Sequence, residues 1–366
     1  MKSNYKKLGG YIRQVDKRNA EGKEENLLGV SVQKKFIPSI ANTNGTDFTK
    51  YKIVKKRQFT YIPDTSRRGD KIGIALLKEY DEGLVSNIYT VFEIVDGKQL
   101  IPDYLMLWFS RPEFDRFARF KSHGSVREVM DWDELCNVEL PVPSYEEQLE
   151  IVNAYQAIAD RISIKQKIND NLAEYLNCVF MDASSTSEDT IPLSDISNYV
   201  TEKATFSDIS TSVYISTENI LQDKQGISSF GTASPSERVT PFQEKDVLVS
   251  NIRPYFKKMW FATSAGGCNA DVLCFRASKS CYTYLLKSVL YQDCFFDFVM
   301  SGAKGTKMPR GDKKHIMQYQ VPLISEDVLK KFNDLALDIE KIQAQNRSEI
   351  SFLYSAQEML LTTLSR

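Results

Sequence analysis

Clusters of lysine and arginine, several of them beside aromatic residues, are the part of this sequence that could do chemistry. Lysine and arginine neutralise phosphates, and arginine, asparagine, glutamine and serine can also read base edges. A single cluster is most often a solvated loop. These clusters recur in both halves of the chain, and the candidate nucleic-acid contacts are Lys34, Lys35, Lys55, Lys56, Arg57, Arg67, Arg68, Lys121 and His123, followed by Arg253, Tyr255, Lys257, Lys258, Lys304, Lys307, Arg310 and Lys313.

No motif predicts an enzyme. A P-loop needs GxxxxGK followed by Ser or Thr, so that backbone amides surround the phosphates, and the stretch GAKGTK at 302–307 is too short. The stretch NIRPYF at 251–256 is superficially similar to the NPPY loop of adenine methyltransferases, but it has an arginine where a tight prolyl turn is needed. The two histidines, His123 and His315, form no nucleophile–base pair with the scattered serines. We therefore expect no catalytic residues.

The cysteines indicate reduced thiols rather than a metal site. None of the six belongs to a CxxC pair, and two histidines cannot complete a tetrahedral zinc set at any sensible spacing. Disulfides are rare in the cytosol, so this usage fits a cytoplasmic protein. We expect neither a metal nor a cofactor in this chain. The cysteines are Cys136, Cys178, Cys268, Cys274, Cys281 and Cys294.

The length, composition and charge of the chain limit the number of domains and the classes of function. The 366 residues are too many for one ordinary domain, and 42% hydrophobic with 26% charged residues is typical of a globular protein. No apolar segment follows the basic N-terminus, and the stretch 284–300 contains charges that prevent it from spanning a bilayer. The 47 basic and 48 acidic residues nearly cancel, so no global field favours a nucleic acid. Residues 1–143 nevertheless carry a net charge of +4, and residues 144–182 carry −4.

The chain repeats itself at an offset of 181 residues. Aligning 138–143 on 319–324 places Pro141 against Pro322, and several further matches keep the same offset. Earlier in each half the register drifts, although 59–63 and 246–250 look equivalent, as do 73–75 and 260–262. We infer that half of the chain is a divergent copy of the other half. The matches are Phe117 with Phe298, Gly124 with Gly305, Asp131 with Asp312, Leu135 with Ile316, Ile158 with Ile339 and Leu172 with Leu353.

Each half has the same order of predicted elements. A segment rich in β-branched and aromatic residues, interrupted by turn signals, predicts short strands and loops. A proline then precedes a long helix, and Ser144 followed by Glu146 and Glu147 is typical of a capped helix start. The predicted fold is α+β, with two mixed β-rich domains at 1–143 and 183–323 and two long helices at 144–182 and 324–366, which pair antiparallel as a coiled coil with an internal pseudo-twofold repeat.

Apolar residues in both long helices recur at spacings of three, four and seven, as in a coiled-coil seam. Both seams turn polar in the middle, at Lys165 and Asn169 in one helix and at Asn346 and Glu349 in the other. Ordinary amphipathic helices can tolerate such residues. Alternatively, antiparallel pairing brings Lys165 near Asn346 or Glu349 and fixes the register. The seam residues are Ile151, Tyr155, Ile158, Ile162, Lys165, Leu172, Leu176, Phe332, Leu335, Ile339, Ile342, Asn346, Leu353 and Leu360.

The whole chain resembles the specificity subunit of type I restriction–modification systems. The stretch VELPVPSYEEQLEIV at 138–152 is similar to the family's entry into its first helix, a PxP followed by EEQ and an apolar pair. The stretches GTKMPRGD at 305–312 and IRPYFKK at 252–258 are similar to segments of family recognition domains. The second helix entry, VPLISED at 321–327, lacks the second proline and the EEQ, and the first domain has no PRGD-like stretch. The two domains are therefore expected to read different sequences.

The resemblance implies a non-catalytic subunit that binds a bipartite, asymmetric site in double-stranded DNA. Each target recognition domain would read one half in the major groove, and the helix pair would set the spacer. Two methyltransferase subunits would methylate adenine with S-adenosylmethionine, and restriction subunits that use ATP and magnesium would cut unmodified DNA. A helix of about 38 residues is ~57 Å long, enough to hold two domains one DNA turn of about 34 Å apart.

A different class of function also fits the same elements. Two β-rich modules on a coiled-coil spacer could be a scaffold that binds only proteins. The two hypotheses separate at the loops, because replacing Arg253, Lys257 and Arg310 with alanine should abolish site methylation only if those loops bind DNA.

Overall fold

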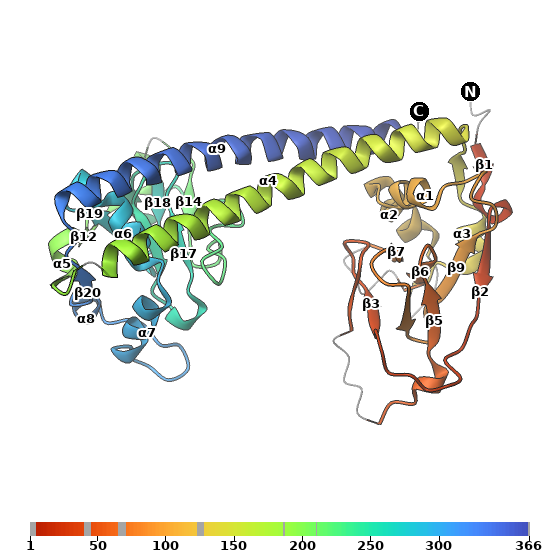
Figure 1. Cartoon of the computed structure of the whole chain (residues 1–366), viewed down its shortest axis with the longest axis horizontal. Coiled ribbons are helices and arrows are strands. Elements are labelled where there is room, and N and C mark those ends of the chain that lie inside the picture. Colours follow the sequence, from red (N-terminus) through yellow and green to blue (C-terminus); the bar gives the residue numbers. More distant parts are fainter. Residues whose placement is uncertain are drawn as a thin grey trace. The chain divides into compact units, whose positions relative to one another are not determined.

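The computed structural model describes residues 5–39, 45–64, 71–122, 128–185, 187–209 and 211–364. The chain divides into two compact units (Figure 1). The first unit comprises Met1–Lys165 with Ser348–Arg366, and the second comprises Gln166–Arg347. Each unit thus contains one β-rich domain and part of both long helices.

A four-stranded antiparallel sheet forms the centre of the first unit. Its order is β2 (Ile12–Val15), β9 (Thr90–Ile94), β6 (Phe59–Ile62) and β7 (Gly73–Leu76). Every residue of β6 is buried, because the strand has neighbours on both sides. Three helices share the core of this sheet: α1 (Pro102–Phe109), α2 (Pro112–Lys121) and α3 (Trp132–Cys136).

Shorter strand pairs complete the first unit. β3 (Leu28–Val30) pairs with β4 (Phe36–Pro38), and β5 (Lys52–Lys55) pairs with β8 (Glu82–Val85). The first strand of the chain, β1 (Tyr5–Lys7), pairs with β10 (Glu139–Pro141), which leads directly into the long helix α4 (Tyr145–Ser185). The two ends of the domain are therefore joined at the helix entry.

The second unit repeats this arrangement. Its central sheet has the order β12 (Ser197–Tyr199), β19 (Val272–Ala277), β16 (Val247–Ser250) and β17 (Met259–Phe261). A second four-stranded sheet contains β13 (Ala204–Thr205), β15 (Arg238–Phe242), β18 (Gly266–Cys268) and β14 (Tyr214–Ile215). After the helices α6 (Thr283–Leu290), α7 (Asp293–Ser301) and α8 (Lys313–Ile316), β20 (Gln320–Pro322) pairs with β11 (Thr190–Pro192) and leads into α9 (Glu326–Thr363).

The offset of 181 holds through the helical part of both repeats. It separates the first residues of α1 and α6 (102 and 283), of α2 and α7 (112 and 293), and of α4 and α9 (145 and 326). The strands drift, since β6 and β16 begin at residues 59 and 247. The predicted equivalence of these strands is confirmed by the sheets, because each lies between the equivalent neighbours. Insertions between strands account for the drift.

The predicted cap at the first long helix is confirmed. Ser144 Oγ accepts a hydrogen bond from the Glu147 N–H at 3.3 Å, and Glu147 Oε2 accepts from the Ser144 N–H at 2.9 Å. This reciprocal pair satisfies two backbone donors that a helix start leaves free. Hydrogen bonds from Ser144 lower the pKa of Glu147.

Gln148, the last residue of the EEQ motif at 146–148, has a structural role at the start of α4. Its side chain is fully buried, accepts from the Ile101 N–H at 2.8 Å and donates to the carbonyls of Gln99 and Pro143, both at 2.9 Å. The amide therefore fastens the helix start to the segment before α1. At the equivalent position of the second unit, buried Leu329 makes an apolar contact instead.

In each unit the two long helices run antiparallel. In the second unit Asn346 Nδ2 donates to Asn169 Oδ1 at 2.8 Å, while further along Phe180 packs on Phe332 with 6.2 Å between ring centroids. In the first unit Lys165 Nζ lies 2.8 Å from Glu349 Oε2. The polar middle of each seam thus pairs with the polar middle of the other helix.

Most seam residues are buried or half-buried, but one prediction is wrong. Ile342 is 45% exposed. The buried residues of α9 include Ala336, Ile339 and Asn346, so the position between the last two falls on residue 343. Gln343 fills it and donates to the Asn169 carbonyl at 2.9 Å.

The helices extend beyond the predicted bounds in one case and fall short in the other. The sequence placed the helical segments at 144–182 and 324–366, whereas α4 is Tyr145–Ser185 and α9 is Glu326–Thr363. The boundary between the two compact units falls inside the residue range of each long helix, after Lys165 and after Arg347. The four-part division at residues 143, 182 and 323 therefore stays a prediction about which parts act separately.

We expect the pair of half-buried Asn169 and buried Asn346 to lower stability while it fixes the register of the two helices. Asn346→Leu alone should destabilise the second unit by about 1–2 kcal/mol, because it leaves the Asn169 amide without its partner. Asn169→Leu combined with Asn346→Leu should recover that loss or exceed it, because an apolar pair needs no hydrogen bond. Urea unfolding of the three variants measures the coupling, and an additive double variant would contradict it.

Candidate nucleic-acid interface

Two loops meet at one end of the central sheet in the second unit. One loop, 251–258, joins β16 to β17, and the other, 302–312, joins α7 to α8. Ile252 forms a β-bridge with Arg310, and the Arg253 N–H donates to the Pro309 carbonyl at 2.8 Å. Lys304 and Arg310 exchange two backbone hydrogen bonds of 2.9 Å. We call this pair of loops the second platform.

The base of the second platform is closely packed. The His315 ring stacks on Phe298 with 4.1 Å between ring centroids, and its Nε2 lies 3.0 Å from the Phe298 carbonyl oxygen. A Cβ at Gly302 would lie 2.1 Å from His315 Cδ2, so this position requires glycine. His315 thus supports the loop.

Basic side chains of the second platform differ in how they are held. Arg310 pairs with Asp271 at 3.0 Å, and Lys304 pairs with Asp312 at 2.6 Å. Lys257 pairs with Asp293 at 3.0 Å, which raises the pKa of the lysine. Lys258 donates to the Thr217 carbonyl at 2.8 Å.

The other predicted residues of this platform project into solvent. Arg253 and Lys307 are exposed, and their side chains have no ion-pair partner among the residues that the structure describes. Tyr255 is 46% exposed and packs against Phe256, and Lys313 is exposed near the Tyr199 ring. This mixture of free cations and positioned ion pairs suits contact with phosphates and base edges.

Asp312 holds the second platform together electrostatically. It caps α8 by accepting from the N–H groups of Lys314 and His315, and its bond from Lys304 does most to lower its pKa to about 2. The lowered pKa means that the contribution of Asp312 to stability is complete above its ordinary pKa of about 3.9 and is lost as the pH falls through 2.

We therefore expect the Asp312 carboxyl to titrate near pH 2, measured by carbon-detected NMR. Lys304→Ala should move this midpoint upward, because the hydrogen bond from Lys304 is the largest cause of the shift. Lys314→Ala serves as the control, since the Lys314 backbone N–H that bonds Asp312 is kept. Equal midpoints in both variants would contradict the assigned cause.

The first unit has an equivalent pair of loops. Loop 63–72 joins β6 to β7, and loop 122–131 joins α2 to α3. Asp64 forms a β-bridge with Val129, and the Met130 N–H donates to the Pro63 carbonyl at 3.0 Å. Lys121, at the end of α2, pairs with Glu134 at 3.4 Å. We call these loops the first platform; its predicted contacts Arg67, Arg68 and His123 lie outside the described residues.

The cluster Lys55–Arg57 lies away from the first platform. It precedes β6, whereas the platform loop follows that strand, and four residues of strand separate the two ends by about 13 Å. Arg57 lies 3.4 Å from Asp103, and Lys56 lies 3.4 Å from Asp81. The structure therefore does not bring these predicted contacts together with the others.

Lys34 differs from its neighbour Lys35. The Lys34 side chain is 7% exposed, pairs with Asp115 at 2.6 Å and lies over the Phe114 ring. Burial lowers the pKa of Lys34. Lys35 is exposed. The placement of Lys34 argues against a phosphate contact, because the ammonium group is committed inside the domain.

Sequence reasoning missed one loop that joins the second platform. The N–H groups of Asp223 and Lys224 donate to the carbonyls of Phe256 and Lys257, and Lys224 Nζ also pairs with Asp293 at 2.6 Å. Both Asp223 and Lys224 have positive φ angles, 53° and 61°. The DKQG sequence at 223–226 predicts a turn. Nothing in that sequence indicates that the turn would pair with Phe256 and Lys257.

Three further observations concern membrane spans, metal ligands and cysteines. Across the part of the chain that the structure describes, no helix is long and apolar enough to cross a membrane. Over the same residues, no group of three histidine, cysteine or acidic side chains could hold a metal ion. The six cysteines are free thiols.

Comparison with known proteins gives a family for about half of the chain and a fold for all of it. Residues 4–174 match the family model described as type I restriction modification DNA specificity domain. A crystal structure of a type I restriction-modification S subunit from M. genitalium has a TM-score of 0.57 at 13% identity, covering 99% of this chain and 96% of that one. This likeness shows the shared fold.

Two further solved structures align over the same length with lower scores. A structure titled as the complex assembly and conformational transition of the type I R-M system aligns at a TM-score of 0.48 and 12% identity, covering 99% and 97% of the two chains. The HsdS subunit of Thermoanaerobacter tengcongensis aligns at 0.37 and 14%, covering 99% and 96%. A search of curated protein sequences gives no match.

Proposed function

Because this chain belongs to the type I restriction–modification DNA specificity family through its residues 4–174, we propose that it is the DNA-recognition subunit of such a complex. In this proposal the chain has no catalytic residues. It directs partner subunits to a bipartite, asymmetric site in double-stranded DNA, and each platform reads one half in the major groove.

The observation that carries this proposal is the recurrence of the platform. In both units the loop after the third strand of the central sheet meets the loop before the last short helix, with the β-bridges Asp64–Val129 and Ile252–Arg310 at equivalent positions. The bridged residues occupy equivalent positions, but the amino-acid sequences of the two pairs of loops differ. Two similar readers with different side chains suit a site with two different halves.

The long helices supply the remaining parts of the proposal. As a pair of fixed length they would set the length of unspecified DNA between the two half-sites. Their exposed apolar side chains suit contacts with partner proteins. We propose that two methyltransferase subunits dock there and methylate adenine with S-adenosylmethionine, and that restriction subunits using ATP and magnesium join them. The exposed apolar side chains on the helices are Tyr145, Leu149, Ile164, Ile168, Tyr175, Met181, Ile342, Phe352, Tyr354 and Met359.

The net charge of −1 limits how tightly the chain alone can bind DNA. Affinity for duplex DNA depends on the number of phosphates that lysine and arginine neutralise. In the proposed complex the methyltransferases therefore contribute much of the phosphate contact. Nanomolar, sequence-specific binding by the isolated chain would contradict this part of the proposal.

A domain exchange tests the assignment of one half-site to each domain. The chain would be co-expressed with a cognate methyltransferase subunit, with residues 183–323 replaced by the second domain of another family member. Mapping of methyladenine across the genome should show one half of the motif changed and the other retained. Changes in both halves would contradict the assignment. A four-residue insertion in α4 and in α9 should lengthen only the gap between the halves.

A further inference from the structure

A cleft of about 640 Å³ lies in the second unit, where the domain meets the two long helices. Its walls come from α4, α9, α6, the edge strand β17 and the turn at 223–227. A smaller cavity of about 180 Å³ adjoins this cleft, because four residues line both of them. The shared residues are Ala173, Lys287, Tyr291 and Gln343.

The ammonium group of Lys287 lies in this cleft without an acceptor. Its Nζ is 4.7 Å from the centre of the Phe261 ring, and no described residue forms a hydrogen bond or an ion pair with it. The side chain is half-buried, but its Nζ is not one of the fully buried polar atoms, so a ligand can reach it. An ammonium group with only a ring beside it lacks the acceptors that buried polar groups normally find.

The internal repeat shows that the fold does not require a lysine at this position. Because α1 and α6 begin 181 residues apart, Lys287 corresponds to Met106. Met106 is buried in the core of the first unit. A methionine in the second unit would fill similar space without removing a charge from water. The lysine is therefore better explained by a ligand than by packing.

A second cation, Arg347 of α9, lines the same cleft. It is exposed, and within the described ranges its side chain has no ion-pair partner. Burial lowers the pKa of Lys287, the nearby Glu340 raises it, and the charge of Arg347 lowers it further. Glu340 already accepts a hydrogen bond from the Tyr284 hydroxyl. An anion beside the two cations would relieve their mutual repulsion.

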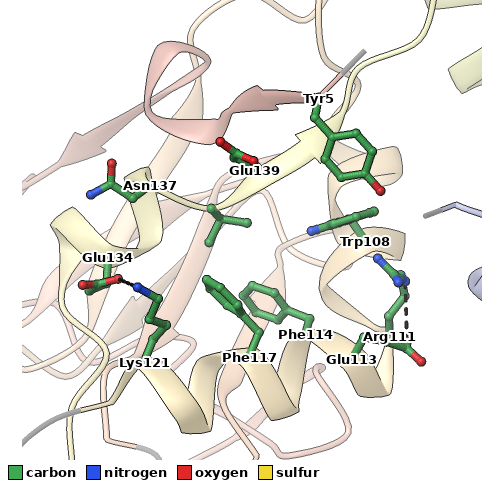
Figure 2. Close-up of a pocket in the computed structure, with 11 residues that line it drawn as sticks. Tyr5, Trp108, Arg111, Glu113, Phe114, Phe117, Lys121, Glu134, Asn137 and Glu139 are labelled. Carbon is green, nitrogen blue, oxygen red and sulfur yellow. Dashed lines mark ion pairs between the residues drawn. The ribbon is translucent and has the colours of Figure 1, made fainter. Parts of the chain in front are cut away.

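The cations of another cavity, in the first unit, are held differently (Figure 2). That cavity has a volume of about 450 Å³, and its two cationic side chains are both paired. Lys121 lies 3.4 Å from Glu134, and Arg111 lies 3.6 Å from Glu113. Its charges are therefore compensated within the protein. The cleft of the second unit differs because Lys287 and Arg347 are left uncompensated.

We propose that the cleft of the second unit binds a small monocarboxylate that carries an apolar group. The carboxylate would accept hydrogen bonds from Lys287 and Arg347, which are the donors that such a group prefers. The apolar group would enter the smaller cavity, where Leu176 and Ile339 are buried. An apolar cavity of about 150 Å³ can hold benzene, so one of about 180 Å³ has room for a phenyl group.

The charges around the cleft favour an anion with a single charge. Three cationic and three acidic side chains line it, so their formal charges cancel. A dianion such as a phosphate monoester would be repelled by the acidic side chains, whereas a monoanion needs only the two cations that lack partners. The cationic residues are Lys224, Lys287 and Arg347, and the acidic residues are Asp170, Asp223 and Glu340.

Ligand-observed NMR titration of the full-length chain tests the proposal with 3-phenylpropionate as the probe. Its amide, 3-phenylpropanamide, has the same apolar group but no charge, and acetate has the charge but no apolar group. We expect 3-phenylpropionate to bind at least about tenfold more tightly than either, because each control lacks one of the two interactions. An affinity equal to that of either control, or no binding of 3-phenylpropionate, would overturn the proposal.

Two variants copy residues of the first repeat. Lys287→Met copies Met106 and should remove the preference for 3-phenylpropionate over its amide, with the melting temperature unchanged or raised. Arg347→Gln copies Gln166, which stands 181 positions earlier, and should reduce that preference at least about threefold. A folded Lys287→Met variant with the preference of the parent would contradict the site. If Lys287→Met fails to fold, an unchanged preference in Arg347→Gln overturns the proposal by itself.

Lys330→Met is the matched control for loss of a positive charge. Lys330 is exposed on α9 and does not line the cleft, so this variant should keep the affinity for 3-phenylpropionate within about twofold. Equal losses of affinity in Lys330→Met and Lys287→Met would show that net charge alone attracts the probe, and would overturn the site. The titration contains neither DNA nor a methyltransferase, so its outcome is independent of the proposed function.

Discussion

Replacing Arg253, Lys307 and Arg310 together with alanine should lower methylation of the target site by at least about 100-fold. These residues occupy the two loops of the second platform, and Arg253 and Lys307 project freely into solvent. Removing one base-reading or phosphate contact costs about 1–3 kcal/mol, so removing three exceeds 100-fold even at the low end. The measurement is the methylation rate on an oligonucleotide duplex by the complex with its methyltransferase partner.

A matched variant separates the platform from general charge. Arg238, Lys279 and Lys341 are exposed in the same unit but outside the platform loops, so their replacement by alanine removes the same charge. We expect this control to retain methylation within about threefold, because exposed charges distant from the DNA act through a screened field. Equal reductions in the two triple variants would show that the platform does not contact DNA. The salt dependence should weaken only in the first variant, by about 0.9 in slope for each phosphate that the protein no longer neutralises.

Arg276→Ala should destabilise the second unit by about 3 kcal/mol. Arg276 donates to both carboxylate oxygens of Asp246, at 2.9 and 2.7 Å, and Asp246 is 1% exposed. Hydrogen bonding to Asp246 raises the pKa of Arg276. Removing the arginine leaves a buried carboxylate without its counter-charge, which is among the most destabilising changes that a single substitution can make.

Hydrogen exchange of the backbone amides in β16 and β19 measures this effect locally. Asp246 directly precedes β16, Arg276 belongs to β19, and the two strands pair with each other. Lys341→Ala is the matched control. It breaks the Lys341–Asp338 pair of 3.0 Å, whose side chains are 64% and 70% exposed, and should cost less than about 0.5 kcal/mol. Similar decreases in protection in the two variants would show that burial of Asp246 does not control its contribution.

The elements with long, regular patterns could be predicted from the sequence. The offset of 181 located both helix entries, because insertions are confined to the loops between strands. The cap at Ser144 followed from residue types alone, since its chemistry involves only neighbours in the chain. The wrong seam residue, Ile342, shows the limit of this reasoning. The heptad pattern alone does not decide whether residue 342 or residue 343 lies in the seam. In the structure Gln343 lies there and donates to the Asn169 carbonyl.

The candidate interface was less accessible to sequence reasoning. The clusters around Arg253 and Arg310 do meet, but the bridge between Ile252 and Arg310 joins residues far apart in the chain. No local pattern indicates that Lys34 would be buried against Asp115, or that Lys55–Arg57 would lie at the other end of β6. Such contacts depend on sheet order, which short strands specify weakly.

The central claim is that two different readers in one chain recognise two separated half-sites. It is tested most directly by co-expressing the unaltered chain with a cognate methyltransferase subunit and mapping methyladenine across the genome by single-molecule sequencing. We predict one motif with two unlike specified halves and an unspecified gap of constant length. A continuous motif, two identical halves, or methylation that is independent of this chain would contradict the account.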